Sequence, residues 1–292
     1  MFNIASTTQS FPLISSKTKN GDNNEVEHNF RYYAKLLACD GYVIIKINPL
    51  VRKHVILLQS EIQTFDKGVK EEFSFVKNTD GVMPVGTTFA RNEEKTDLCE
   101  TFNYWYKYRS VHNEHIFSNE MFYRIISICE CQLFKIASSI LREMVGTYQY
   151  EHPLEVRDDS YVQFNVYPEA MKRSSRVNLQ DLHEDGHLIT LIKPNGPGLT
   201  IQLAGVDYIV NLEVDEAIII AGSLLTELTD GEIQPVYHSV LDLNLPSARA
   251  SLIYNVNALY ESMPSVRGRE IPMRDIANRH HMEFGQHPYH SQ

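Results

Sequence analysis

Cysteine and tryptophan are scarce in this chain of 292 residues, which has four Cys and one Trp. The cysteines are Cys39, Cys99, Cys129 and Cys131. Their spacing matches no zinc-binding pattern, because Cys129 and Cys131 are not followed by a second close pair. Cys129 and Cys131 fall in a long apolar helical pattern, where we expect buried free thiols. Free thiols suit a reducing compartment, so we expect a cytoplasmic protein.

Long hydrophobic runs are also missing, and basic residues are fewer than acidic ones. No run reaches the roughly eighteen apolar residues that a membrane helix needs. Residues 1–19 do not show a basic start followed by an apolar block, so we expect no secretion signal. With 27 Lys and Arg against 37 Asp and Glu, the formal net charge is -10. We therefore expect neither a membrane nor a nucleic-acid partner, while the oligomeric state stays open.

Hydrophobic periodicity predicts helices first and short strands afterwards. Helical patterns cover 30–38, 49–65 and 119–145, and 42–47 is a short buried strand. Further strands are predicted at 161–167, 189–192, 199–203, 208–212, 217–220, 236–241 and 251–257. Many short strands separated by turns indicate an antiparallel sandwich or barrel. The fold class is thus mainly β with flanking helices.

No segment has the composition of a linker, so we expect a single domain over 1–292. Within it, 1–150 is a helix-rich part that packs on the core, and 151–260 is the β-rich core with the site. Residues 261–292 form a polar, His-rich C-terminal segment. That segment either folds over the site as a lid or hangs free, and its histidines are expected to be exposed to solvent.

Three residues of the β-rich part form a candidate metal face. In an extended segment His183 and Asp185 project to the same side, while Glu184 points away. His238 follows 55 residues later (238 − 183), after about four strands, which is enough for the chain to return to the same place. Two imidazoles and one carboxylate suit iron(II) and leave open positions on the ion. Glu184 is the rival carboxylate, and His187 either adds to the site or caps a turn.

An Arg-x-Ser pair begins eleven residues after His238 (249 − 238). Arg249 and Ser251 lie on one face of the next predicted strand. A guanidinium binds a carboxylate through two hydrogen bonds, and a serine hydroxyl can add one more. A second copy, Arg173 and Ser175, stands in a predicted polar loop. The first pair predicts a carboxylate ligand beside the metal.

Other polar and aromatic residues are candidates for the wall of the pocket. Along 161–167 the side chains of Tyr161, Gln163, Asn165 and Tyr167 share one face, which is suited to line a cavity. The run 91–109 combines arginines with aromatic residues. From these two segments we predict substrate contacts for Arg91, Tyr104, Tyr106, Gln163 and Tyr161. The substrate is then expected to be a small molecule, with a carboxylate as one candidate group; the alternative for 91–109 is a strand that packs on the core.

Taken together, these residues resemble the iron(II)/2-oxoglutarate-dependent dioxygenase superfamily, in its isopenicillin-N-synthase-like branch. The resemblance runs from about residue 11 to 260 and is tight from Tyr161 onward. It rests on His-x-Asp at 183–185 with the distant His238, on Arg-x-Ser at 249–251 and on Asn-Val-Tyr-Pro at 165–168. Segment 97–102 resembles a further family motif. The family has an Asp where Ser223 stands and a Pro where Glu169 stands.

The resemblance implies a double-stranded β-helix, the cupin-like jelly roll, with Fe(II) held by His183, Asp185 and His238. It implies 2-oxoglutarate as co-substrate, with its far carboxylate bound by Arg249 and Ser251. Tyr167 and Asn165 would then line the pocket of the co-substrate. The implied activity uses O2 to oxidise an unactivated C–H bond of a small molecule, with release of succinate and CO2. Hydroxylation is the default outcome; desaturation or cyclisation needs only another substrate pose. Secondary metabolism is the implied setting.

Three other functions fit the same residues. An oxidase of the isopenicillin-N-synthase type keeps the metal face but uses no 2-oxoglutarate. A zinc hydrolase would use a similar ligand set. A non-catalytic jelly roll that binds a small molecule would have a purely structural histidine cluster.

Overall fold

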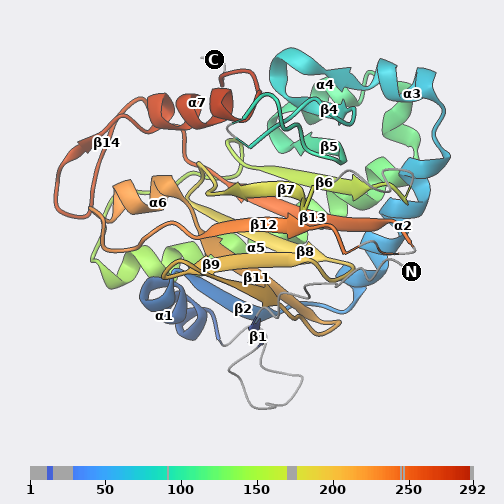
Figure 1. Ribbon diagram of the computed structural model, residues 1–292. Coiled ribbons are helices and arrows are strands. Elements are labelled where there is room, and N and C mark those ends of the chain that lie inside the picture. The colour runs from blue at the N-terminus through green and yellow to red at the C-terminus, as the bar shows by residue number, and fades with distance from the viewer. Residues whose placement is uncertain are drawn as a thin grey trace, which may run out of the picture.

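The architecture is described from a computed structural model, for residues 12–15, 29–90, 92–169, 176–243, 245 and 247–289. Strands form the centre of the molecule and helices cover them (Figure 1). The strands make two large sheets and a small pair, β14 (Met263–Pro264) with β15 (Glu270–Ile271).

The larger sheet has eight strands and takes them from both halves of the chain. In spatial order they are β2 (Tyr42–Lys46), β11 (Glu216–Ala221), β8 (Ile189–Pro194), β13 (Arg249–Val256), β6 (Tyr161–Tyr167), β5 (Glu100–Trp105), β4 (Asp80–Met83) and β3 (Ser74–Phe75). All of the neighbouring pairs are antiparallel. Because 42–105 supplies four of these strands, the sheet joins the helix-rich part to the core. That the chain is a single domain stays a prediction.

The smaller sheet has five strands and carries two of the predicted metal ligands. In spatial order they are β1 (Leu13–Ile14), β10 (Val206–Val210), β9 (Leu199–Leu203), β12 (Tyr237–Leu241) and β7 (Asn178–His183). Only β1 with β10 is parallel among these pairs of described strands. From β6 to β13 the chain passes repeatedly between the two sheets. The predicted jelly-roll, or double-stranded β-helix, core is thus confirmed.

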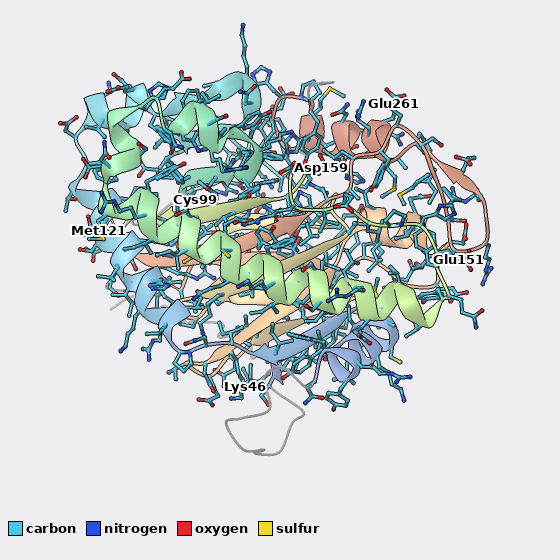
Figure 2. The ribbon with its side chains drawn as sticks, turned by 180° about the vertical axis from the view of Figure 1, so that it is seen from behind. Lys46, Cys99, Met121, Glu151, Asp159 and Glu261 are labelled. Carbon is cyan, nitrogen blue, oxygen red and sulfur yellow. The ribbon has the colours of Figure 1, made fainter. Side chains whose placement is uncertain are left out.

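Helices cover the outer face of the larger sheet. Helix α5 (Met121–Thr147) crosses the back of the strands in Figure 2 and contacts α1 (Phe30–Asp40) and α2 (Leu50–Thr64). Its apolar side chains, such as Phe122 and Leu133, join the outward-facing residues of the strands in one core cluster. Because α5 packs on the outer face of the larger sheet, only the inner face of this sheet can contribute residues to a site.

The remaining helices are short, apart from one near the C-terminus. They are α3 (Lys67–Glu72), α4 (Arg109–His112), α6 (Ser223–Leu228) and α7 (Met273–Glu283), with 3-10 turns at Val76–Asn78, Tyr106–Tyr108 and Ile116–Asn119. Among the described residues, no helix combines the length and the apolar character needed to cross a membrane.

The predicted helices at 30–38, 49–65 and 119–145 agree with α1, α2 and α5 to within two residues. The strands at 161–167 and 199–203 are confirmed with the same ends. Residues 261–292 were not predicted to hold regular structure, yet they contain α7. The buried face of α7 consists of Met273, Ala277 and His281, which is too weak an apolar pattern to signal a helix. All four cysteines are free; Cys129 is buried, whereas Cys131 is only partly so.

Candidate metal centre

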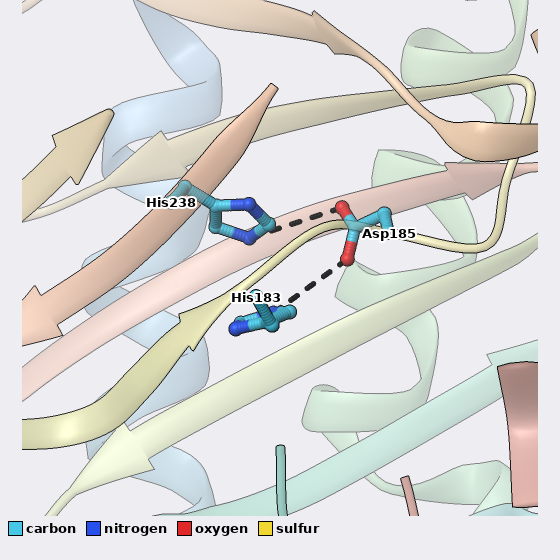
Figure 3. A group of neighbouring side chains, drawn as sticks. All are labelled: His183, Asp185 and His238. Atoms are coloured by element: carbon cyan, nitrogen blue, oxygen red, sulfur yellow. Dashed lines mark ion pairs between the residues drawn. The ribbon is translucent and has the colours of Figure 1, made fainter. Parts of the chain in front are cut away.

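His183, Asp185 and His238 meet at one point between two neighbouring strands. His183 is the last residue of β7, and it pairs in register with His238 on β12. Residues directly opposite one another in an antiparallel pair point to the same face of the sheet. Asp185 follows two residues after His183, where the chain has left the strand and turns back. Figure 3 shows the Asp185 carboxylate facing both imidazoles.

The spacing of the three side chains fits a shared ion. The Nε2 atoms of His183 and His238 lie 3.7 and 3.8 Å from different oxygens of Asp185, too far for a hydrogen bond. The ligand atoms all lie within 4.8 Å of one another. Atoms that each bind one ion at about 2.1 Å are separated by about 3–4 Å. The carboxylate of this group is Asp185, and Glu184 does not belong to it.

The surroundings keep two of the ligands in the protonation states that bind metal. The Nδ1–H of His183 donates to the carbonyl oxygen of Asp181 at 2.7 Å, which leaves the Nε2 lone pair for an ion. Burial lowers the pKa of His183, and the neighbouring His238 lowers it further. Burial alone would raise the pKa of Asp185, but His238, His187 and His183 bring it down to about 2. Near neutral pH, His183 is therefore neutral and Asp185 is ionised.

A buried guanidinium lies on the inner face of the larger sheet. Arg249 begins β13, is 3% exposed and donates from Nε to the carbonyl oxygen of Pro197 at 3.0 Å. Its Nη1 and Nη2 atoms are buried and have no hydrogen-bond partner among the described residues. The guanidinium lies 5.0 Å from the ring centre of Tyr167, its register partner on β6. Leaving donors of a buried cation unpaired is unfavourable, so this geometry fits an anionic ligand.

The other residues predicted around Arg249 form a cross-strand row on the same face. Ser251 pairs in register with Asn165 and is buried with it. The Asn165 side-chain oxygen accepts from Thr101 at 2.9 Å and from Gln163 at 3.0 Å. Asn255 donates to Gln163 at 3.2 Å. These bonds hold the amide side chains in place along the inner face of the sheet.

A cavity opens at the metal ligands, and the C-terminal segment forms one of its walls. Tyr161, Gln163 and His187 line it from the predicted regions, and His281 and Phe284 line it from the C-terminal side. The Phe284 ring lies edge-on to His183, with 5.2 Å between ring centres. The segment thus packs over the site, and the expectation that its histidines are exposed is wrong for His281, which is 5% exposed.

Not every predicted substrate residue reaches the cavity. Tyr104 lies on the opposite face of β5, where it packs against Tyr123 and His112 in the core. Tyr106 is covered by the guanidinium groups of Arg157 and Arg109, 3.6 and 3.9 Å from its ring centre. A substrate role for Tyr104 or Tyr106 is therefore not supported by their positions. Arg91 lies outside the described residues.

The cavity residues that the sequence analysis missed include Asp97, His281 and Phe284. Asp97 belongs to the segment 97–102, whose resemblance to a family motif carried no functional signal by itself. The two others lie in a segment without strong periodicity. Only the folded chain brings them to the metal ligands.

Sequence comparison gives no match: no protein-family model fits the chain, and no curated protein sequence is similar enough. Solved structures do match. Neurospora crassa T7H, in complex with alpha-KG and 5-formyluracil, superimposes with a TM-score of 0.70 at 16% identity, over 89% of this chain and 92% of that chain. JOX2 in complex with 2OG, Fe and JA gives 0.66 at 13% identity, over 92% and 85%.

A third structure agrees with these two. The dioxygenase for auxin oxidation 1 from Arabidopsis thaliana, in complex with 2-oxoglutarate, gives a TM-score of 0.63 at 15% identity, over 88% of this chain and 96% of that chain. The match extends along nearly the whole length of all three proteins. The chain therefore has the fold of the 2-oxoglutarate- and iron(II)-dependent oxygenases.

Proposed function

We propose that the protein is a non-haem iron(II), 2-oxoglutarate-dependent oxygenase that oxidises an unactivated C–H bond of a small molecule. Hydroxylation is the default outcome, and succinate and CO2 are released. The observation that carries the proposal is a pair of complementary sites, one at each of the two large sheets. His183, Asp185 and His238 offer three ligand atoms within 4.8 Å of one another, and Arg249 offers two buried donors that have no partner among the residues that the structure describes.

His183, Asp185 and His238 would hold the metal and leave the remaining positions of an octahedral ion open. Bound iron(II) supplies a site where a keto acid and dioxygen react. Arg249 would bind the far carboxylate of 2-oxoglutarate, with the Ser251 hydroxyl beside it. Tyr167, next to the guanidinium, and Asn165, in the hydrogen-bonded row, would line the same pocket.

The ligands of the structural relatives agree with this assignment. T7H was solved with alpha-KG together with 5-formyluracil, and JOX2 with 2OG, Fe and JA. Each therefore holds 2-oxoglutarate and a second small molecule. In this chain Tyr161 and Gln163 line the cavity at the metal ligands, so they are the proposed contacts for such a substrate. The expectation of a substrate carboxylate rested on the arginines and aromatic residues of 91–109 and stays a prediction.

An anaerobic titration with iron(II) and 2-oxoglutarate tests the proposal. Chelation of the metal by the keto acid should give a metal-to-ligand absorption band in the visible, which needs no knowledge of the substrate. Asp185→Asn should abolish the band, because it removes a charged ligand from the metal face. Glu184→Gln is the matched control and should keep it. A zinc hydrolase or a purely structural histidine cluster predicts no band in any of the three proteins.

The second candidate function is an oxidase of the isopenicillin-N-synthase type. The buried Nη1 and Nη2 donors of Arg249, which have no partner among the described residues, also favour it, because they can hold a carboxylate of the substrate itself. The two functions differ in stoichiometry. Succinate formed in step with product supports the 2-oxoglutarate-dependent reaction, whereas product formed without succinate supports the oxidase.

A further inference from the structure

Asp97 is a buried carboxylate in the wall of the metal cavity that the proposed reaction does not use. It lies three residues before β5, is 3% exposed and lines the cavity together with Thr88 and Gln180. Its Oδ2 atom accepts hydrogen bonds from the Thr88 hydroxyl at 3.0 Å and from Gln180 Nε2 at 3.4 Å. Its Oδ1 atom is buried and has no hydrogen-bond partner among the described residues.

A half-satisfied buried carboxylate is unfavourable unless a ligand completes it. The protein offers no ion pair to Asp97 among the described residues. Arg176 is close enough to interact electrostatically with Asp97. Its ion pair, however, is with Asp181, at 3.3 Å. The described lining of the cavity contains two carboxylates, Asp97 and Asp185, and no Lys or Arg. Asp185 belongs to the metal face. Asp97 is therefore the carboxylate of the described lining that is left to bind a second ligand.

The C-terminal side of the cavity is suited to the body of an organic cation. The His281 ring stacks on Tyr289, with 4.1 Å between centres and 20° between planes, and Phe284 adds another ring. His281 Nδ1–H donates to the carbonyl oxygen of His287, so the buried and unpartnered Nε2 is a hydrogen-bond acceptor. Aromatic faces and acceptors attract cations and N–H groups.

We propose that the substrate presents a protonated amine to the free Oδ1 atom of Asp97. The inference rests on the proposed function and deepens it, because it names the chemical class that the cavity selects. The amine would complete the hydrogen bonding of Asp97 and would neutralise its charge. The apolar part of the substrate would lie against the aromatic rings of the C-terminal segment. Asp97 is then a specificity-determining residue.

The alternative role for Asp97 is structural. Its backbone stabilises the preceding loop, because the Asp97 N–H donates a hydrogen bond to the Thr88 carbonyl oxygen at 2.8 Å. Its side chain holds Gln180, which in turn accepts from the Tyr167 hydroxyl at 3.3 Å. A purely structural Asp97 would therefore affect the co-substrate residues as much as the substrate.

The test uses the full chain loaded anaerobically with iron(II) and 2-oxoglutarate, so that the metal and Arg249 are occupied first. The probes are benzylamine, which is protonated at neutral pH, and benzyl alcohol, which has the same shape without the charge. Titration calorimetry gives the Kd of each probe for the wild type, for Asp97→Asn and for Glu94→Gln. Glu94 is exposed on the same loop and serves as the control for overall charge.

We expect Asp97→Asn to weaken benzylamine binding by about tenfold or more, as for other charge-assisted hydrogen bonds. Benzyl alcohol and 2-oxoglutarate should bind that variant as they bind the wild type, and Glu94→Gln should change nothing. Equal weakening of both probes, unchanged benzylamine binding in Asp97→Asn, or no benzylamine binding to the wild type would each overturn the inference. The visible band of the loaded protein reports on the proposed function separately.

Discussion

Arg249 offers the most direct test of the proposed co-substrate site, because its Nη1 and Nη2 atoms are buried and have no hydrogen-bond partner in the described part of the chain. In Arg249→Ala these donors are lost, and we expect the KM for 2-oxoglutarate to rise by about ten- to a hundredfold, the range for hydrogen bonds to a charged group. Initial rates over a range of 2-oxoglutarate concentrations measure this. Arg249→Lys keeps the charge but not the planar fork, so its KM should be intermediate. An unchanged KM in Arg249→Ala would remove Arg249 from the site.

Single residues also show what a sequence can and cannot reveal about such a site. The meeting of His183, Asp185 and His238 could be predicted, because a metal face would restrict both the residue types and their order on the strands. Asp97 was not, because an aspartate in a loop has many uses. Its role depends on an unpaired oxygen, which only the folded chain shows.

Helix α7 is held against the cavity by a contact that only glycine allows. A Cβ atom on Gly186 would lie 2.3 Å from Cβ of His280. We therefore expect Gly186→Ala to push α7 away from the cavity and to speed hydrogen exchange over 273–289. Gly146→Ala is the control, because a Cβ on Gly146, near the end of α5, has nothing within 4 Å. Equal exchange in Gly186→Ala and the wild type would show that α7 is not fixed by this contact.

The elements that the sequence predicted well are those with a strong period. Helix α5 has one apolar stripe over 27 residues, and the strand 161–167 alternates between a polar inner face and an apolar outer face. Helix α7 lacks such a stripe, since its buried side includes Ala277 and His281. Residues of α7 line the cavity, so the position of the helix depends on contacts with distant parts of the chain. The sequence of 273–283 alone does not show these contacts.

The proposed ligand sites draw residues from both large sheets and from the C-terminal segment, so ligands bound there should stabilise the whole fold. His183 and His238 come from the smaller sheet, Arg249 comes from the larger one, and Phe284 covers His183. Iron(II) with 2-oxoglutarate would bind the folded chain and not the unfolded one. At a free 2-oxoglutarate concentration one hundred times its Kd, the added free energy of unfolding is about 2.7 kcal/mol.

Anaerobic thermal unfolding with and without the two ligands measures this linkage. We expect the Tm to rise with 2-oxoglutarate concentration only when iron(II) is present, because the keto acid end needs the metal. Asp185→Asn should abolish the rise, and Arg249→Ala should move it to higher 2-oxoglutarate concentrations. A rise that is independent of iron would indicate that the Arg249 pocket binds anions by itself, and the two sites would then be separate.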